Sequence, residues 1–101
     1  MENKAKILNM LGLAMRANKL VTGEELTLKD LRSNTTKFVF VAADASENTR
    51  KKFKDKCSYY NVPVSESLDQ AELSQAIGRT RMIIGINDHG FAAKIKELIK
   101  G

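Results

Sequence analysis

The most constraining feature of the sequence is an unbroken apolar run, FVFVAA at residues 38–43, which is rich in residues that favour β-strands. A strand with one face in water would alternate apolar and polar side chains, whereas this run fits a central strand covered on both faces. A second apolar run, MIIGI, occupies residues 82–86. The two runs therefore predict a sheet with helices packed on both sides.

Apolar residues at three- and four-residue spacing predict five helices around these two strands. The expected helices span about residues 3–17, 22–32, 46–60, 69–78 and 91–100, and short strands are expected at residues 20–21 and 62–64. Strands that alternate with helices favour an α/β fold, here a three-layer α/β/α sandwich with a small, mixed, four-stranded sheet. The 101 residues contain no linker or internal repeat, so we expect a single domain over residues 1–101.

Residues typical of helix ends mark several of these boundaries. Thr22 precedes Glu25 by the three residues of a capping box. Asp69 precedes Glu72 by the same spacing, and Ser46 fits an N-cap. In the last helix we expect the apolar side chains to face inward; these are Phe91, Ala92, Ile95, Leu98 and Ile99.

Charge and composition narrow the class of partner and the compartment. Seventeen Lys and Arg residues against twelve Asp and Glu residues give a net charge of +5, which favours polyanionic partners such as nucleic acid. No apolar stretch approaches the roughly 18 residues of a membrane span, so we expect a cytoplasmic protein with no membrane partner. One cysteine and one histidine exclude an internal disulfide and a structural zinc site, and we expect no metal and no cofactor.

The residues that could carry catalysis form no recognisable set. No glycine-rich phosphate loop follows the run at residues 38–43. Cys57 and His89 could form a nucleophile and a base, but Cys57 shares a helical stripe with Phe53, which favours a buried and inert thiol. His89 fits a polar turn residue, and Asp44 fits a corner between a strand and a helix. We therefore expect no catalytic residues and a protein that is not an enzyme.

The start of the second expected helix, at residues 22–25, carries groups suited to a nucleic-acid backbone. The free N–H groups and the positive dipole end of a helix bind phosphate, and Lys29 and Arg32 follow along the same helix. Glu24 and Glu25 oppose this interpretation, because carboxylates there satisfy the same donors and repel phosphate.

Two further basic segments could contact nucleic acid. Arg79 and Arg81 flank Thr80 in a loop, where their guanidinium groups could pair with phosphates or bases, or complement the end of the preceding helix. The run RKKFKDK at residues 50–56 is the densest charge in the chain. On a helix its cations spread around most faces, which favours a solvated outer surface over a dedicated RNA patch.

Several motifs, in order along the chain, resemble those of a known family. They are GLAMRANKL at residues 12–20, GEE at residues 23–25 with Lys29, DASENT at residues 44–49, KC at residues 56–57 with YYNVP at residues 59–63, and EL at residues 72–73 with AIG at residues 76–78. These motifs resemble the ribosomal L7Ae family, most closely its bacterial YlxQ-like subgroup. The resemblance implies the same sandwich fold and RNA binding, since well-studied members bind kink-turn RNA, a sharply bent duplex with sheared G·A pairs and an extruded base.

In kink-turn binders of this family, the start of the second helix contacts the G·A guanines and the loop after the fourth helix cradles the extruded base. By this resemblance these roles fall on Gly23, Glu25, Leu26, Lys29, Arg79, Thr80 and Arg81. Together with Lys19, Thr22 and Arg32, they are the RNA-binding residues that we expect. The chain departs from those binders at Glu25-Leu26, where they carry a polar pair such as Asn-Glu or Lys-Gln. It also departs at the second loop, where the usual residues are small or apolar.

The departure at Leu26 leaves two hypotheses for function. Leu26 offers no side-chain hydrogen bond to a guanine, and it lies opposite Leu28 and Leu31 on the helix, so we expect it to be exposed. The first hypothesis is a monomeric, non-catalytic protein that binds structured RNA, ribosomal or kink-turn-like. The alternative is a protein-interaction module for a transcription or translation factor, in which Leu26 meets the partner.

Overall fold

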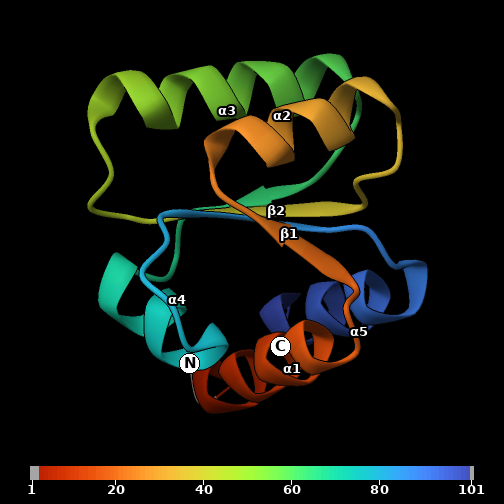
Figure 1. Cartoon of the computed structure of the whole chain (residues 1–101), viewed down its shortest axis with the longest axis vertical. Coiled ribbons are helices and arrows are strands. Elements are labelled where there is room, and N and C mark those ends of the chain that lie inside the picture. Colours follow the sequence, from red (N-terminus) through yellow and green to blue (C-terminus); the bar gives the residue numbers. More distant parts are fainter. Residues whose placement is uncertain (1–2, 101) are drawn as a thin grey trace.

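The computed structural model describes residues 3–100 and contains, within them, five helices and four strands (Figure 1). In chain order these are α1 (Lys4–Arg16), β1 (Leu20–Thr22), α2 (Glu24–Arg32), β2 (Phe38–Val41), α3 (Glu47–Tyr59), β3 (Val64–Ser65), α4 (Gln70–Ile77), β4 (Ile83–Ile86) and α5 (His89–Lys100). The order of helices and strands is the one expected from the apolar patterning.

The four strands form one mixed sheet in the order β1-β4-β2-β3. The central strand β4 pairs antiparallel with β1 on one side and with β2 on the other, while β2 and β3 run parallel. Because of this topology, the end of β1 lies beside the start of β4, the start of β2 lies beside the end of β4, and β3 begins at that same end of the sheet.

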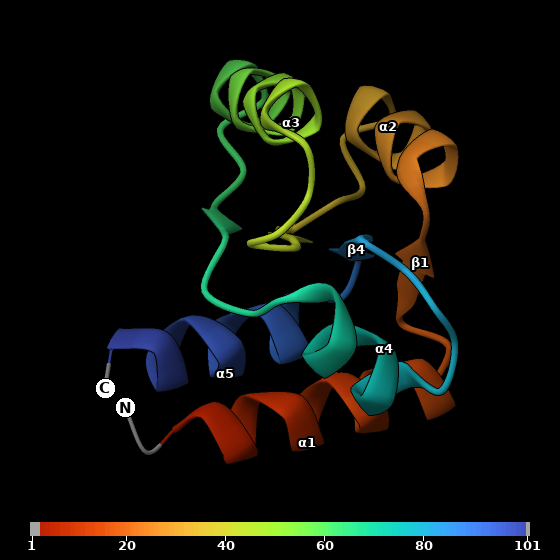
Figure 2. The same ribbon diagram turned by 90° about the vertical axis from the view of Figure 1, so that its left-hand side faces the viewer.

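Helices cover both faces of the sheet. α2 and α3 lie on one face, and α1, α4 and α5 lie on the other (Figures 1 and 2). The arrangement confirms the expected three-layer α/β/α sandwich with a mixed four-stranded sheet. It follows from the two central strands, since every residue of β2 and β4 is buried and needs cover on both sides.

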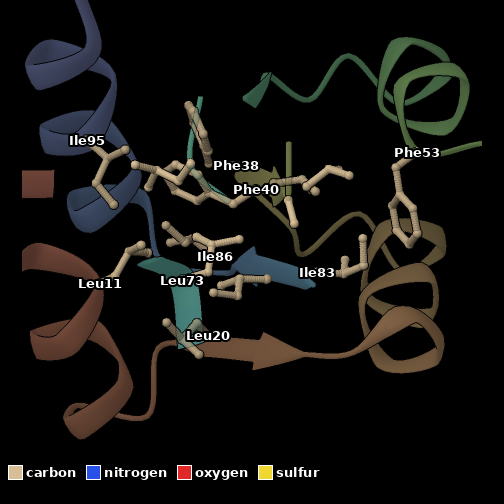
Figure 3. Packing of buried hydrophobic residues seen from close by; sticks show 14 of the residues in the cluster. Leu11, Leu20, Phe38, Phe40, Phe53, Leu73, Ile83, Ile86 and Ile95 are labelled. Atoms are coloured by element: carbon tan, nitrogen blue, oxygen red, sulfur yellow. The ribbon is translucent and has the colours of Figure 1, made fainter. Parts of the chain in front are cut away.

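Successive side chains of the central strands fill two apolar layers. Figure 3 shows Phe40 and Ile86 directed toward Leu11 of α1 and Ile95 of α5, whereas Ile83 lies on the side of α3. Together these buried side chains form one hydrophobic cluster.

A glycine in the central strand sets how closely α2 approaches the sheet. A Cβ atom on Gly85 would lie 3.0 Å from Cγ2 of Thr27 on α2 and 3.3 Å from Cγ2 of Val21 on β1. Thr27 is completely buried, and its hydroxyl has no hydrogen-bond partner among residues 3–100. The missing side chain at Gly85 therefore lets α2 pack directly over β4.

Three details differ from the sequence-based expectations. The strand expected at residues 62–64 is β3, which begins at Val64, because the N–H of Val62 donates to the carbonyl of Cys57 and closes the end of α3. Ile99, expected to face inward, is instead 41% exposed near the end of α5. α5 also begins at His89, since Asp88 accepts a hydrogen bond from the N–H of Phe91 and caps the helix two residues earlier than expected.

The single cysteine lies in the apolar layer, as its helical spacing indicates. Cys57 is completely buried on α3. Burial raises the pKa of its thiol to about 11, so that the neutral thiol dominates near pH 7. His89 is exposed, and no hydrogen bond joins it to Cys57 in the described chain, so the two do not form a nucleophile and base.

Two further features are absent from residues 3–100. None of the helices in this range has the length and apolar character needed to span a membrane. Nor do His, Cys, Asp and Glu side chains gather there in groups of three or more that could hold a metal ion.

We predict that Gly85→Ala destabilises the protein by about 1–3 kcal/mol, because the added methyl group overpacks the contact with Thr27. The variant Gly85→Ala/Thr27→Ala removes the nearest of the atoms that crowd this methyl group, Cγ2 of Thr27. The loss of unfolding free energy in this double variant, measured in urea, should be smaller than the sum of the two single losses by at least about 0.5 kcal/mol. Strictly additive effects would contradict the proposed contact.

We also predict a pH effect from Cys57. The unfolded thiol ionises near its ordinary pKa, while the folded thiol ionises near pH 11, so the buried neutral thiol stabilises the fold below about pH 9. That contribution, up to about 2–3 kcal/mol, is lost as the pH rises from about 9 to 11. Urea unfolding of the wild-type protein and Cys57→Ala across this range should show a steeper decline for the wild type; parallel curves would refute the prediction.

Candidate nucleic-acid interface

The start of α2 and the loop that follows α4 meet at one end of the sheet (Figure 2). In the antiparallel pair of β1 and β4, Thr22 lies opposite Ile84, and the N–H of Gly23 donates to the carbonyl of Ile83 at 2.9 Å. Nε of Arg81 then donates to Oγ1 of Thr22 at 3.1 Å. This bond links side chains 59 residues apart in the sequence, so the two expected RNA-binding segments form one continuous surface.

Arg81 is held in place by three further hydrogen bonds. Its Nη1 donates to the carbonyl of Thr80 at 2.7 Å, and its backbone N–H donates to Oγ of Ser74 at 3.0 Å. Oγ of Ser74 also donates to the carbonyl of Arg81 at 3.4 Å. Ser74 on α4 was not singled out in the sequence, and no motif marks it there.

The alternative role expected for Arg79 and Arg81 was to place positive charge at the C-terminal end of α4. That end is closed by Gly78, which has a left-handed backbone with φ +80° and donates its N–H to the carbonyl of Ser74. The guanidinium of Arg81 bonds to Thr22 and to the carbonyl of Thr80 instead. Arg79 and Thr80 are exposed beside it, so this loop presents one fixed and one free guanidinium group.

The capping box expected between Thr22 and Glu25 is wrong. Gly23 is the N-cap of α2, with a φ of +94° that a residue with a side chain rarely adopts. The hydroxyl of Thr22 is taken by Arg81 and makes no cap. The first N–H groups of α2 therefore have no side-chain cap in the described chain and remain available to an anion.

The two glutamates at the start of α2 differ in their surroundings. The carboxylate of Glu24 forms an ion pair with Nζ of Lys52 on α3, which turns it toward the neighbouring helix. Glu25 is exposed; Lys29 follows it by four residues and Arg32 follows Lys29 by three, all on the solvent side of α2. Of the two carboxylates that oppose a phosphate, one is thus neutralised within the fold.

Leu26 is 55% exposed on the first turn of α2, as its position opposite Leu31 indicates. Its side chain can make apolar contacts but no hydrogen bond. It lies one turn before Lys29, so an apolar group interrupts the polar surface at the start of this helix.

Two of the expected binding residues lie apart from the others. Lys19 precedes β1, at the opposite end of this strand from Thr22, and its carbonyl accepts from the N–H of Asn87 at 3.0 Å. Arg32 ends α2, about 12 Å along the helix axis from Glu24. The structure brings together Thr22, Gly23, Glu25, Leu26, Arg79, Thr80 and Arg81, with Lys29 one turn further along α2.

The basic run on α3 is largely neutralised by ion pairs. Its cations pair with carboxylates on α3, on α2 and in the loop after β3: Lys51 with Asp55, Lys52 with Glu24, and both Arg50 and Lys54 with Glu66. Lys51, Lys52, Lys54 and Lys56 are exposed, which is consistent with a solvated outer surface; a contact of this run with RNA stays untested.

Solved structures share the same arrangement of helices and strands. A structure described as a protein with unknown function from Bacillus halodurans superposes with a TM-score of 0.93 at 41% identity and covers 96% of this chain and 99% of its own. A 15.5kD RNA binding protein from Giardia lamblia superposes with a TM-score of 0.79 at 18% identity and covers 97% of this chain and 91% of its own, which establishes likeness of fold alone.

Sequence comparisons identify the family. The chain is 60% identical over 99 residues to a protein of Enterococcus faecium named RNA-binding protein YlxQ, covering 98% of this chain and 96% of the relative. It is 44% identical over 91 residues to the protein of the same name in Bacillus subtilis, covering 89% and 91%. The model of the ribosomal protein L7Ae/L30e/S12e/Gadd45 family matches residues 5–96. With nearly its whole length matched, this chain belongs to the ribosomal protein L7Ae/L30e/S12e/Gadd45 family.

Proposed function

We propose that this chain is a non-catalytic protein that binds structured RNA, ribosomal or kink-turn-like, through the N-terminus of α2 and the loop after α4. The hydrogen bond between Arg81 and Thr22 carries the proposal, because it joins a helix N-terminus and an arginine loop into one surface. The two relatives named RNA-binding protein, at 60% and 44% identity, support RNA as the ligand.

The chemistry of this surface suits a folded RNA backbone. The uncapped N–H groups of α2 and the remaining N–H groups of the Arg81 guanidinium can donate to phosphate oxygens, while Arg79 and Lys29 supply exposed positive charge. Such groups bind by position and charge and read little sequence, which is how proteins recognise the shape of structured RNA.

Glu25 and Leu26 determine how strongly binding of a kink-turn would depend on its G·A pairs. By the resemblance to kink-turn binders, the start of α2 faces the guanines of the G·A pairs. The carboxylate of Glu25 can accept hydrogen bonds from a guanine edge, whereas Leu26 can only make apolar contact. We therefore propose that this chain binds a kink-turn with weaker dependence on its G·A pairs than binders with a polar pair.

The alternative, a protein-interaction module, depends on Leu26. A single exposed leucine is an ordinary feature of a soluble surface. One copy of the chain supplies both segments, so the proposal requires neither a second copy nor a transcription or translation factor.

We predict that Arg79→Ala/Arg81→Ala weakens binding to structured RNA at least about tenfold, and that it lowers the slope of affinity against salt by roughly one for each phosphate no longer bound. The matched control is Lys6→Ala/Lys100→Ala, which removes the same charge from exposed positions on α1 and α5. Filter binding at several salt concentrations measures both quantities. Equal losses of RNA affinity in the two double variants would mean that the chain binds RNA by net charge alone.

Thr22→Val tests the hydrogen bond from Arg81 to Thr22 without changing the charge of the protein. It removes the acceptor of Arg81 and leaves every cation in place, so we expect weaker binding by about three- to tenfold with an unchanged salt slope. A Thr22→Ser variant keeps the acceptor and should bind as the wild type does. If Thr22→Val binds as tightly as Thr22→Ser, the joined surface is not the RNA site.

Kink-turn selectivity gives a separate prediction. Glu25→Asn/Leu26→Glu introduces the polar pair, and we expect it to raise the preference for an intact kink-turn over the same RNA with disrupted G·A pairs by about tenfold. Gel-shift titration of both RNAs with the wild-type protein and the variant gives the two ratios. An unchanged ratio would mean that these side chains do not face the G·A pairs.

A further inference from the structure

A second polar feature lies at the other end of the sheet. A cavity of about 290 Å³ opens where the chain enters β2 and β3 and leaves β4. Its wall includes Thr36 and Lys37 before β2, Tyr60 at the end of α3, and His89 and Lys96 of α5. The four residues of β4, about 13 Å of extended chain, separate this cavity from Arg81.

The charged side chains that line the cavity carry one sign. Lys37 and Lys96 lie in its wall together with His89, and the lining contains no Asp or Glu. Neither lysine takes part in an ion pair among residues 3–100. The cavity is therefore lined by two exposed positive charges that no carboxylate of residues 3–100 pairs with.

Acidic groups on the adjoining segments are engaged elsewhere, among them Glu97, which pairs with Lys94 on α5. Asp30 accepts a hydrogen bond from the side chain of Asn87 at 3.3 Å. Asp88 accepts from the N–H of Phe91 at 2.9 Å and caps α5. At the end of α3, the carbonyls of the last turn already accept the N–H groups of residues 60–62. The local field thus favours an anion despite the nearby helix terminus.

Two uncharged groups complete the wall. Thr36 is 4% exposed, and its hydroxyl has no hydrogen-bond partner in the described chain, an arrangement that costs stability unless a ligand or water supplies one. Tyr60 is half-buried in the lining, and its ring meets that of Tyr59 edge to face, with the ring centroids 4.9 Å apart. Planar ligand groups pack on side chains of this type.

We propose that this cavity binds a small phosphate monoester of about mononucleotide size, with its phosphate held by Lys37 and Lys96 and its planar group against Tyr60. Charge-assisted hydrogen bonds to lysine are a common way to hold phosphate. The volume stands at the lower limit for small-molecule sites, which favours a compact free ligand over a strand of RNA. The inference is independent of the proposed function, since no residue is shared between the two sites.

The test is an NMR titration of the full chain with adenosine monophosphate as the probe, with adenosine and inorganic phosphate as comparison ligands. We expect the monophosphate to bind at least tenfold more tightly than adenosine, and to shift the amides of Thr36, Asn61 and Ala93 most. Lys37→Gln/Lys96→Gln should weaken binding at least tenfold. Lys6→Gln/Lys100→Gln, with the same change in charge at exposed positions, should bind within twofold of the wild type.

Several results would overturn the proposal. One is that adenosine monophosphate does not bind at millimolar concentration, and another is that adenosine binds as tightly as the monophosphate. The others are that the two lysine double variants lose equal affinity, or that the amide shifts centre on Gly23 and Arg81. A titration with an RNA duplex should leave Asn61 and Ala93 unperturbed; shifts there would assign the cavity to an RNA phosphate instead. Arg79→Ala/Arg81→Ala should keep full affinity for the monophosphate, which separates this test from the failure of the RNA site.

Discussion

Burial of the central strand β4 on both faces is the constraint on which the rest of the structure depends. All four of its residues are buried, and it pairs with β1 and β2 on either side. Helices must therefore cover both faces, and Gly85 lets α2 pack directly on the strand. Loops and polar groups therefore lie at the two ends of β4.

The candidate RNA surface is built at the start of this strand by a contact between distant segments. β1 delivers Gly23 and the N-terminus of α2 to that point, and β4 begins just after Arg81. Gly23, which has no side chain, leaves the first N–H groups of α2 without a side-chain cap, and the bond from Arg81 to Thr22 fixes one guanidinium beside them. The paired strands β1 and β4 thus hold the hydrogen-bond donors of a loop in place, although loops are in general more mobile than strands.

The sequence predicts the fold well and the candidate site in part, because the first depends on local patterns and the second on long-range contacts. Apolar runs and helical spacing predicted the layers, and the capping box of Asp69 and Glu72 forms because its partners are three residues apart. The same spacing failed at the start of α2, where Gly23 supplies the N-cap and Arg81 captures the hydroxyl of Thr22. Family motifs located both segments, but the bond that joins them has no signature in the sequence.

The most direct test of the central claim, that these joined segments form the RNA surface, is an amide shift map of the isotope-labelled protein titrated with a kink-turn RNA. We expect the largest changes at residues 23–26 and 79–81, with small changes along the basic run at residues 50–56 of α3. Changes concentrated on α3, or spread evenly over all exposed lysines, would contradict the claim and indicate binding by net charge alone.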